Sequence, residues 1–227
     1  MREYSIDATK IKNPIYKAPI DMGGFDKNGK KLEIGNYYLK YDGKPFFAIC
    51  GEAHFSRINS ELWENEIIKM KQGGLNIIAS YIFWIHHEEE EGKFDWTGNK
   101  NLRRFLKICK KHKMYMILRI GPFSHGECRN GGFPDWLFGK PFDIRCDDPE
   151  YLKYTKRFFE EIYTQAKGYL FKDGGPVIGV QLENEHEHAS CPWEITTENS
   201  KEWVVSGKNG NSHMATLKKI AQEVGFD

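Results

Sequence analysis

The pattern of apolar residues along the chain predicts four short, buried strands. Each expected strand is a nearly continuous apolar run with β-branched or aromatic residues, which is typical of strands covered on both faces of a parallel sheet. Glycine pairs such as Gly73-Gly74 and Gly174-Gly175 mark turns before two of these runs. The expected strands span residues 46–50, 76–84, 114–120 and 175–182.

Amphipathic helices are predicted between the strands and after the last one. Apolar residues there recur at the three- and four-residue spacing of a helix with one buried face. The clearest helix start is Asp148-Pro149, because aspartate caps a helix and proline suits its first position. Strands that alternate with helices in this way indicate a parallel sheet.

The number of strand–helix units sets the predicted fold class. Four units are half of an eight-fold barrel, and a complete barrel typically needs about 250 residues. We therefore predict an α/β fold of the (β/α)8 TIM-barrel type, with only about the first four βα units present in this chain. Residues 1–36 are polar and are predicted to be an irregular lead-in, and residues 37–227 are predicted to form the partial barrel.

Composition and charge narrow the range of partners. The chain has 33 basic and 32 acidic residues, and no basic patch or acidic tail favours nucleic acid or a membrane surface. The N-terminus lacks the apolar segment of a signal peptide, and no apolar run approaches the length of a membrane-spanning helix. The five cysteines are an odd number without CxxC spacing, which favours a reducing, cytoplasmic environment.

The stretch from residue 175 to residue 186 carries the clearest candidate chemistry. It begins as an apolar strand and ends in polar residues, namely Gln181, Glu183, Asn184, Glu185 and His186. In parallel α/β folds, ligands bind at the carboxyl ends of the strands. Glu185 is therefore a candidate general acid, and the alternative interpretation is an ordinary charged residue at a strand end.

Four segments, one at each strand end, resemble glycoside hydrolase family 35, the β-galactosidases. Residues 51–57 resemble the family's Gly-x-x-His-Tyr-x-Arg segment, and residues 80–88 resemble Thr-Tyr-Val-x-Trp-Asn-x-His-Glu. Residues 118–127 resemble Leu-Arg-Pro-Gly-Pro-Tyr-x-x-Ala-Glu, and Asn184-Glu185 resembles the acid/base motif of the retaining (β/α)8 glycosidases. The segments follow one another in the family's order, which makes the resemblance specific.

The resemblance implies roles for individual residues. Glu185 would be the catalytic acid/base in the retaining hydrolysis of terminal β-D-galactosides or related β-glycosides. Tyr81 and Glu127 would contact the sugar, and Asn184 would hold its 2-hydroxyl. His125 stands where the family often has a sugar-binding Asn or Cys, so it is a further candidate for substrate binding. For Tyr81 the alternative is a ring that fills the barrel.

Tryptophans and two departures from the family's pattern complete the expected pocket. Trp84 is a candidate for stacking on a sugar face, with core packing as the alternative. His186 stands where the family usually has Tyr, and Ile85 stands where it has Asn. The same stacking role and the same alternative apply to Trp136, Trp193 and Trp203.

The expected mechanism lacks one of its two carboxyl groups. A retaining glycosidase needs an acid/base and a nucleophile about 5–5.5 Å apart, and the resemblance places the nucleophile on a seventh strand. We therefore assign no nucleophile, although Glu183 is expected to point the same way as Glu185 on an extended strand. The chain alone is expected to hydrolyse β-galactosides poorly or not at all. An open half barrel would also favour self-association.

Two other functions stay open at this point. A non-catalytic carbohydrate-binding or assembly module could keep the same pocket residues. A metal-dependent hydrolase could use the histidines near the strand ends, but no H-E-x-x-H or comparable spacing appears, so no metal or other cofactor is expected. These histidines are His54, His86, His87, His125, His186 and His188.

Overall fold

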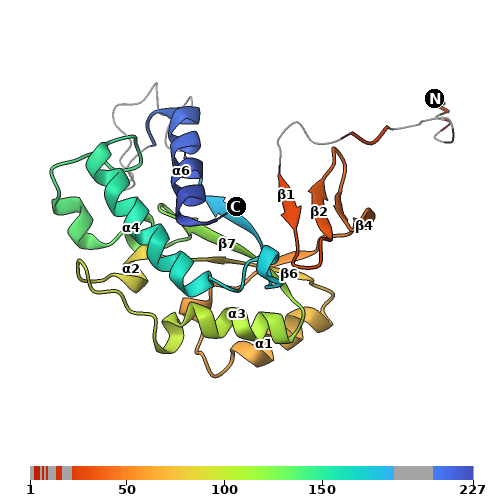
Figure 1. The fold of residues 1–227 in the computed structure, drawn as a ribbon, viewed down its shortest axis with the longest axis horizontal. Helices are drawn as coiled ribbons and strands as arrows, with labels where there is room; N and C mark the ends of the chain where they lie inside the picture. Colours follow the sequence, from red (N-terminus) through yellow and green to blue (C-terminus); the bar gives the residue numbers. More distant parts are fainter. Residues whose placement is uncertain are drawn as a thin grey trace. The chain divides into compact units, whose positions relative to one another are not determined.

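The computed structural model describes residues 3–5, 7, 9, 14–16, 22–186 and 207–226, and it divides the chain into two compact units. The first unit spans residues 1–47 and the second spans residues 48–227 (Figure 1). Along the described chain, no helix combines the length and the apolar character that crossing a bilayer requires.

The first unit contains a four-stranded antiparallel sheet. Its strands are β1 (Gly23–Phe25), β2 (Lys31–Ile34), β3 (Leu39–Tyr41) and β4 (Lys44–Phe46), paired in chain order. Asp42 and Gly43 form the hairpin turn between β3 and β4, and both have the positive φ that a tight hairpin requires. Because β3 pairs with β2, this sheet continues past the expected boundary at residue 36, and the structure divides the chain after Phe47 instead.

The second unit is built on a four-stranded parallel sheet. Its strands are β5 (Cys50–Glu52), β6 (Ile77–Tyr81), β7 (Tyr115–Gly121) and β8 (Val177–Leu182), in the order β5-β6-β7-β8. The expected alternation of parallel strands and helices is therefore confirmed.

Helices cover one face of the parallel sheet. In Figure 1, α1 (Trp63–Gln72), α3 (Leu102–Lys111), α4 (Pro149–Ala166) and α6 (Gly210–Val224) lie along this face. Asp148 caps α4 as expected, because its side chain accepts hydrogen bonds from the backbone N–H groups of Glu150 and Tyr151. The short helix α2 (Trp84–His87) follows β6 directly. Single 3₁₀ turns lie at Phe55–Arg57, Gly98–Lys100, Arg129–Gly132, Asp135–Gly139 and Phe171–Asp173.

The side chains of β7 alternate between the two faces of the sheet. Met116, Leu118 and Ile120 are buried in the apolar core that the helices cover. Ile117 and Arg119 point to the opposite face, which we call the inner face. The inner face of a parallel sheet therefore carries a charged side chain close to the carboxyl ends of its strands.

The first expected strand differs from its prediction. Residues 46–50 were expected to be buried, but β5 begins only at Cys50, Ile49 is 40% exposed and Cys50 is exposed. Among the described residues, β5 has a strand neighbour on one side only, so its apolar residues lack the cover that a central strand receives. Residues 46–50 are apolar, but their composition does not indicate that the strand lies at the edge of the sheet.

Trp84 is a core residue. Its side chain is 0% exposed and stacks on Phe158 with ring centroids 4.6 Å apart. Its indole N–H donates to Glu88 Oε2 at 2.6 Å. The expectation that Trp84 stacks on a sugar is therefore wrong, because β6 ends at Tyr81 and the turn into α2 directs Trp84 towards the helices.

A buried histidine predicts acid sensitivity of the fold. His87 lies in the core, stacks on Trp96 and shares a hydrogen bond with the Asp95 carbonyl oxygen, and burial lowers its pKa to about 3. In the unfolded chain the His87 ring binds a proton with a pKa near 6.5, whereas in the folded chain the ring stays neutral down to a much lower pH. The free energy of unfolding therefore falls as the pH drops below about 6.5. We expect His87 to lower the free energy of unfolding by about 2 kcal/mol from pH 6.5 to pH 5.

Urea unfolding at these two pH values measures the effect. His87→Phe keeps an aromatic ring in the core and removes the titrating group, so its loss of stability between the two pH values should be smaller than that of the parent chain. Equal losses in the two proteins would contradict the assignment.

Candidate active site

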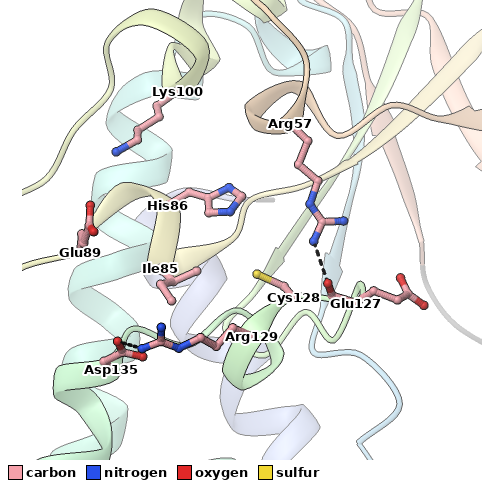
Figure 2. A pocket seen from close by; sticks show the side chains of 9 residues that line it. All are labelled: Arg57, Ile85, His86, Glu89, Lys100, Glu127, Cys128, Arg129 and Asp135. Carbon is pink, nitrogen blue, oxygen red and sulfur yellow. Dashed lines mark hydrogen bonds and ion pairs between the residues drawn. The ribbon is translucent and has the colours of Figure 1, made fainter.

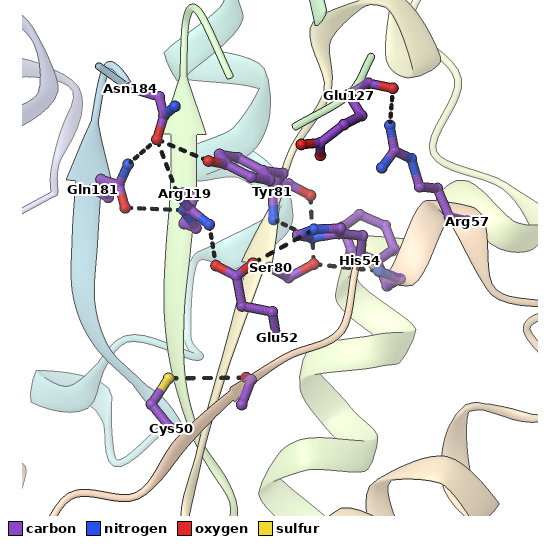
Figure 3. Close-up of polar contacts among 12 residues, drawn as sticks. Cys50, Glu52, His54, Arg57, Ser80, Tyr81, Arg119, Glu127, Gln181 and Asn184 are labelled. Atoms are coloured by element: carbon purple, nitrogen blue, oxygen red, sulfur yellow. Dashed lines mark hydrogen bonds and ion pairs between the residues drawn. The ribbon is translucent and has the colours of Figure 1, made fainter. Parts of the chain in front are cut away.

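Register brings three polar side chains side by side at the carboxyl end of the sheet. Tyr81 of β6 lies opposite Arg119 of β7, which lies opposite Gln181 of β8. Partners in a parallel ladder point to the same face, so all three lie on the inner face. Asn184 follows β8 and completes the group, which we call the strand-end cluster (Figure 3).

Asn184 is the centre of the strand-end cluster. Its Oδ1 accepts hydrogen bonds from the Tyr81 hydroxyl at 2.8 Å, from Arg119 Nη2 at 2.9 Å and from Gln181 Nε2 at 3.2 Å. Three donors around one oxygen fix the orientation of the amide.

Arg119 links the cluster to the neighbouring strands. Its Nε donates to Gln181 Oε1 at 2.9 Å, and its guanidinium forms an ion pair with Glu52 at the end of β5. The same guanidinium lies 3.6 Å from the centroid of the Tyr81 ring. Sequence reasoning assigned no role to Arg119 or Gln181, although a polar side chain within an apolar strand was the signal that could have found them.

Tyr81 carries its proton at neutral pH. Burial, together with the negative charges of Glu52, Glu185 and Glu127, raises its pKa to about 12, and the positive charge of Arg119 opposes this shift. The hydroxyl is therefore a hydrogen-bond donor, consistent with its bond to Asn184.

Glu127 lies on the long loop after β7. It is exposed, and Arg57 Nη2 donates to its backbone oxygen at 3.3 Å. The neighbouring Gly126 allows the loop to pass close to Tyr81, because a Cβ there would lie 2.8 Å from the Phe83 ring and 3.2 Å from the Tyr81 ring.

His125 lies on the same loop but outside the strand-end cluster. It is half-buried, and its ring meets Phe123 edge-on with centroids 5.9 Å apart. Within the part of the chain that the structure describes, it shares no hydrogen bond with Tyr81, Glu127 or Asn184. Its substrate-binding role stays a prediction.

Glu183 and Glu185 point in different directions. The strand ends at Leu182, and both glutamates have a left-handed backbone, with φ of 57° and 47°. Glu183 is buried and forms a bidentate ion pair with Arg145, whereas Glu185 is exposed. The expectation that the two side chains point the same way is wrong, because the chain leaves the extended conformation after residue 182.

A pocket of about 450 Å³ is lined by Glu127 and by residues that lie outside the strand-end cluster (Figure 2). In Figure 2 the Glu127 side chain extends away from His86 and Ile85, so the pocket is bounded by the backbone side of this residue. The pocket is lined by Arg57, Ile85, His86, Glu89, Lys100, Glu127, Cys128, Arg129 and Asp135.

The histidines near the strand ends have different hydrogen-bond partners and do not form one group. His54 Nδ1 accepts from the Tyr81 backbone N–H at 3.3 Å, and His86 Nδ1 lies 2.8 Å from Ser56 Oγ. Among the described residues, no three His, Cys, Asp or Glu side chains are grouped in a way that could hold a metal ion. His188, Trp193 and Trp203 lie outside the described residues, and Trp136 is half-buried against Trp84.

Comparison with known proteins identifies the family. The sequence model for glycosyl hydrolases family 35 matches residues 38–224. The chain belongs to this family. It is 34% identical over 167 residues to a β-galactosidase of Xanthomonas manihotis, and 39% identical over 165 residues to one of Oryza sativa. These alignments cover 73% and 71% of this chain, but only 28% and 20% of the two relatives.

Solved structures support the family's fold. An endo-1,4-β-mannanase from Rhizomucor miehei has a TM-score of 0.59 at 12% identity, covering 85% of this chain and 57% of that one. An exo-β-1,4-mannosidase from an Opitutaceae bacterium has a TM-score of 0.57 at 16% identity, covering 89% of this chain and 32% of that one. The family 35 chain therefore has the α/β TIM-barrel glycosidase fold, and it spans about a quarter of the length of its curated relatives.

Proposed function

We propose that this chain supplies the sugar-binding and acid/base part of a β-galactosidase that acts with retention on terminal β-D-galactosides. The observation that carries the proposal is the hydrogen bond between Tyr81 and Asn184 at the strand ends, with Glu185 next to Asn184 in the chain. The aligned relatives are β-galactosidases, and they share the family to which this chain belongs.

Each residue of the site has a defined chemical task in this proposal. The Asn184 amide donates to the sugar 2-hydroxyl, a contact that strengthens in the transition state. Glu127 accepts hydrogen bonds from ring hydroxyls, which a carboxylate does strongly and with directional preference. Glu185 gives a proton to the departing glycosidic oxygen and then takes one from the attacking water.

The nucleophile is not assigned to any described residue. Glu183 is held in its ion pair with Arg145, and Glu127 has a binding role. A retaining mechanism needs a second carboxylate about 5–5.5 Å from the acid/base. We therefore expect hydrolysis by this chain alone to be slow.

A panel of aryl glycosides tests the substrate. The folded chain is assayed with aryl β-D-galactoside, β-D-glucoside and β-D-mannoside at equal concentration. We expect slow hydrolysis with the galactoside preferred. A preference for the glucoside or the mannoside would contradict the choice of galactose.

Self-association through the sheet edges is a further prediction. Within the described ranges, β5 and β8 each have one strand neighbour, and Ile49 beside β5 is 40% exposed. Unpaired edges and exposed apolar residues favour pairing with a second copy. We expect light scattering to show a concentration-dependent rise in molar mass that Ile49→Lys reduces. A constant monomeric mass would contradict this.

A further inference from the structure

The turn that carries Glu185 has an unusual backbone. Glu183 and Glu185 both have positive φ, and neither is a glycine. Side chains with a Cβ rarely adopt this conformation, so neighbouring groups must hold it in place. The direction of the Glu185 carboxyl therefore depends on whatever fixes this turn.

Arg145 is the group that holds the turn. Its Nε and Nη2 donate to the two carboxylate oxygens of Glu183, each at 2.8 Å. Nη2 also donates to the backbone oxygens of Asn184 at 3.0 Å and of Glu185 at 3.1 Å. One guanidinium thus contacts three consecutive residues, and the last of them is the proposed acid/base.

Arg145 is itself firmly placed. Its side chain is 1% exposed, and its guanidinium lies 3.6 Å from the centroid of the Phe123 ring. Burial favours the protonated form of Glu183, but the His186 ring, whose Nδ1 lies 3.7 Å from Glu183 Oε1, and the hydrogen bonds from Arg145 outweigh it and hold the pKa of Glu183 below its ordinary value. The charge of Arg145 therefore has an ionised partner at neutral pH, and the pair is buried as a unit.

We propose that Arg145 is the positioning residue of the acid/base: by holding the backbone oxygens of Asn184 and Glu185, it directs the Glu185 carboxyl into the site. This rests on the proposed function of Glu185, but the turn itself can be observed without any activity. Arg145 lies 38, 39 and 40 positions before the three residues that its guanidinium contacts, which are Glu183, Asn184 and Glu185.

Arg145→Lys tests the proposal, with Arg157→Lys as its matched control. Lysine keeps the charge but cannot reproduce the planar, multiple hydrogen bonds of the guanidinium. Arg157 also pairs with a buried glutamate, Glu88, but it lies on α4 and does not contact the turn. Both variants are expected to melt earlier than the parent chain, so the melting temperature alone does not distinguish positioning from structural support.

The decisive readout is the backbone NMR signals of Asn184 and Glu185. We expect Arg145→Lys to shift or broaden these signals and Arg157→Lys to leave them in place. In galactoside hydrolysis, Arg145→Lys should lower kcat roughly tenfold to a hundredfold with little change in KM, because the acid is displaced while binding is retained. Unmoved Glu185 signals in a folded Arg145→Lys chain would overturn the proposal.

The experiment also covers a variant that does not fold and a parent chain that has no galactoside activity. If Arg145→Lys does not fold, Glu183→Gln removes the ionised partner of Arg145, and unmoved Glu185 signals in that folded variant would also overturn the proposal. If the signals move in Arg145→Lys but even the parent chain neither binds nor hydrolyses a galactoside, then the positioning role of Arg145 holds and the proposed function fails.

Discussion

Replacing Glu185 by glutamine is expected to lower β-galactoside hydrolysis by this chain about 10²- to 10⁴-fold for substrates with a poor leaving group. Glutamine keeps the size of the side chain but cannot give a proton to the glycosidic oxygen. Because the parent rate is itself expected to be low, the assay needs a fluorogenic galactoside and long incubation. Glu160→Gln, an exposed position on α4, is the matched control and should hydrolyse at the parent rate.

The leaving group identifies the role of Glu185. The dinitrophenolate group of a dinitrophenyl galactoside leaves without taking up a proton. Cleavage of its glycosidic bond should therefore be much less affected by Glu185→Gln than cleavage of an alkyl or umbelliferyl galactoside. Equal losses with both substrates would indicate that Glu185 acts in some way other than as the acid. Turnover that survives the substitution in full would show that another group is the acid.

Trp84→Ala is expected to lower the free energy of unfolding by about 3–5 kcal/mol. The side chain is fully buried, stacks on Phe158 and donates to Glu88, so its removal leaves a cavity and an unpaired buried acceptor. Urea unfolding followed by circular dichroism measures the change.

An exposed aromatic residue provides the comparison for Trp84. Phe138 is 45% exposed, and Phe138→Ala should lower the free energy of unfolding by less than about 1 kcal/mol. A Trp84→Ala chain that is as stable as the parent but binds galactoside more weakly would contradict the core assignment, and would restore the sugar-stacking role that the sequence suggested.

The apolar pattern was sufficient for β6, β7 and β8, because each is a run of mainly apolar residues that the fold buries wholly or in part. Asp148-Pro149 likewise predicted the start of α4. The strand-end motifs also brought Tyr81 and Asn184 together correctly, since the carboxyl ends of parallel strands meet at one edge. These signals are local, so the sequence contains them directly.

The features that could not be predicted from the sequence depend on contacts between residues that are far apart in the chain. The ion pair of Arg145 and Glu183 joins residues that are 38 positions apart, and the sequence around either residue does not indicate its partner. The direction of Trp84 depends on where β6 ends and how the chain turns, which strand propensity does not determine. The exposure of β5 likewise follows from its place at the sheet edge and not from its own composition.

Binding of a galactoside by the folded chain tests the central claim most directly, because binding does not need a nucleophile. Titration with methyl β-thiogalactoside, which resists hydrolysis, should show saturable binding that Asn184→Ala and Glu127→Gln weaken while both variants stay folded. A folded chain that binds no galactoside, or that binds it equally well in both variants, would contradict a sugar site at the ends of β6, β7 and β8.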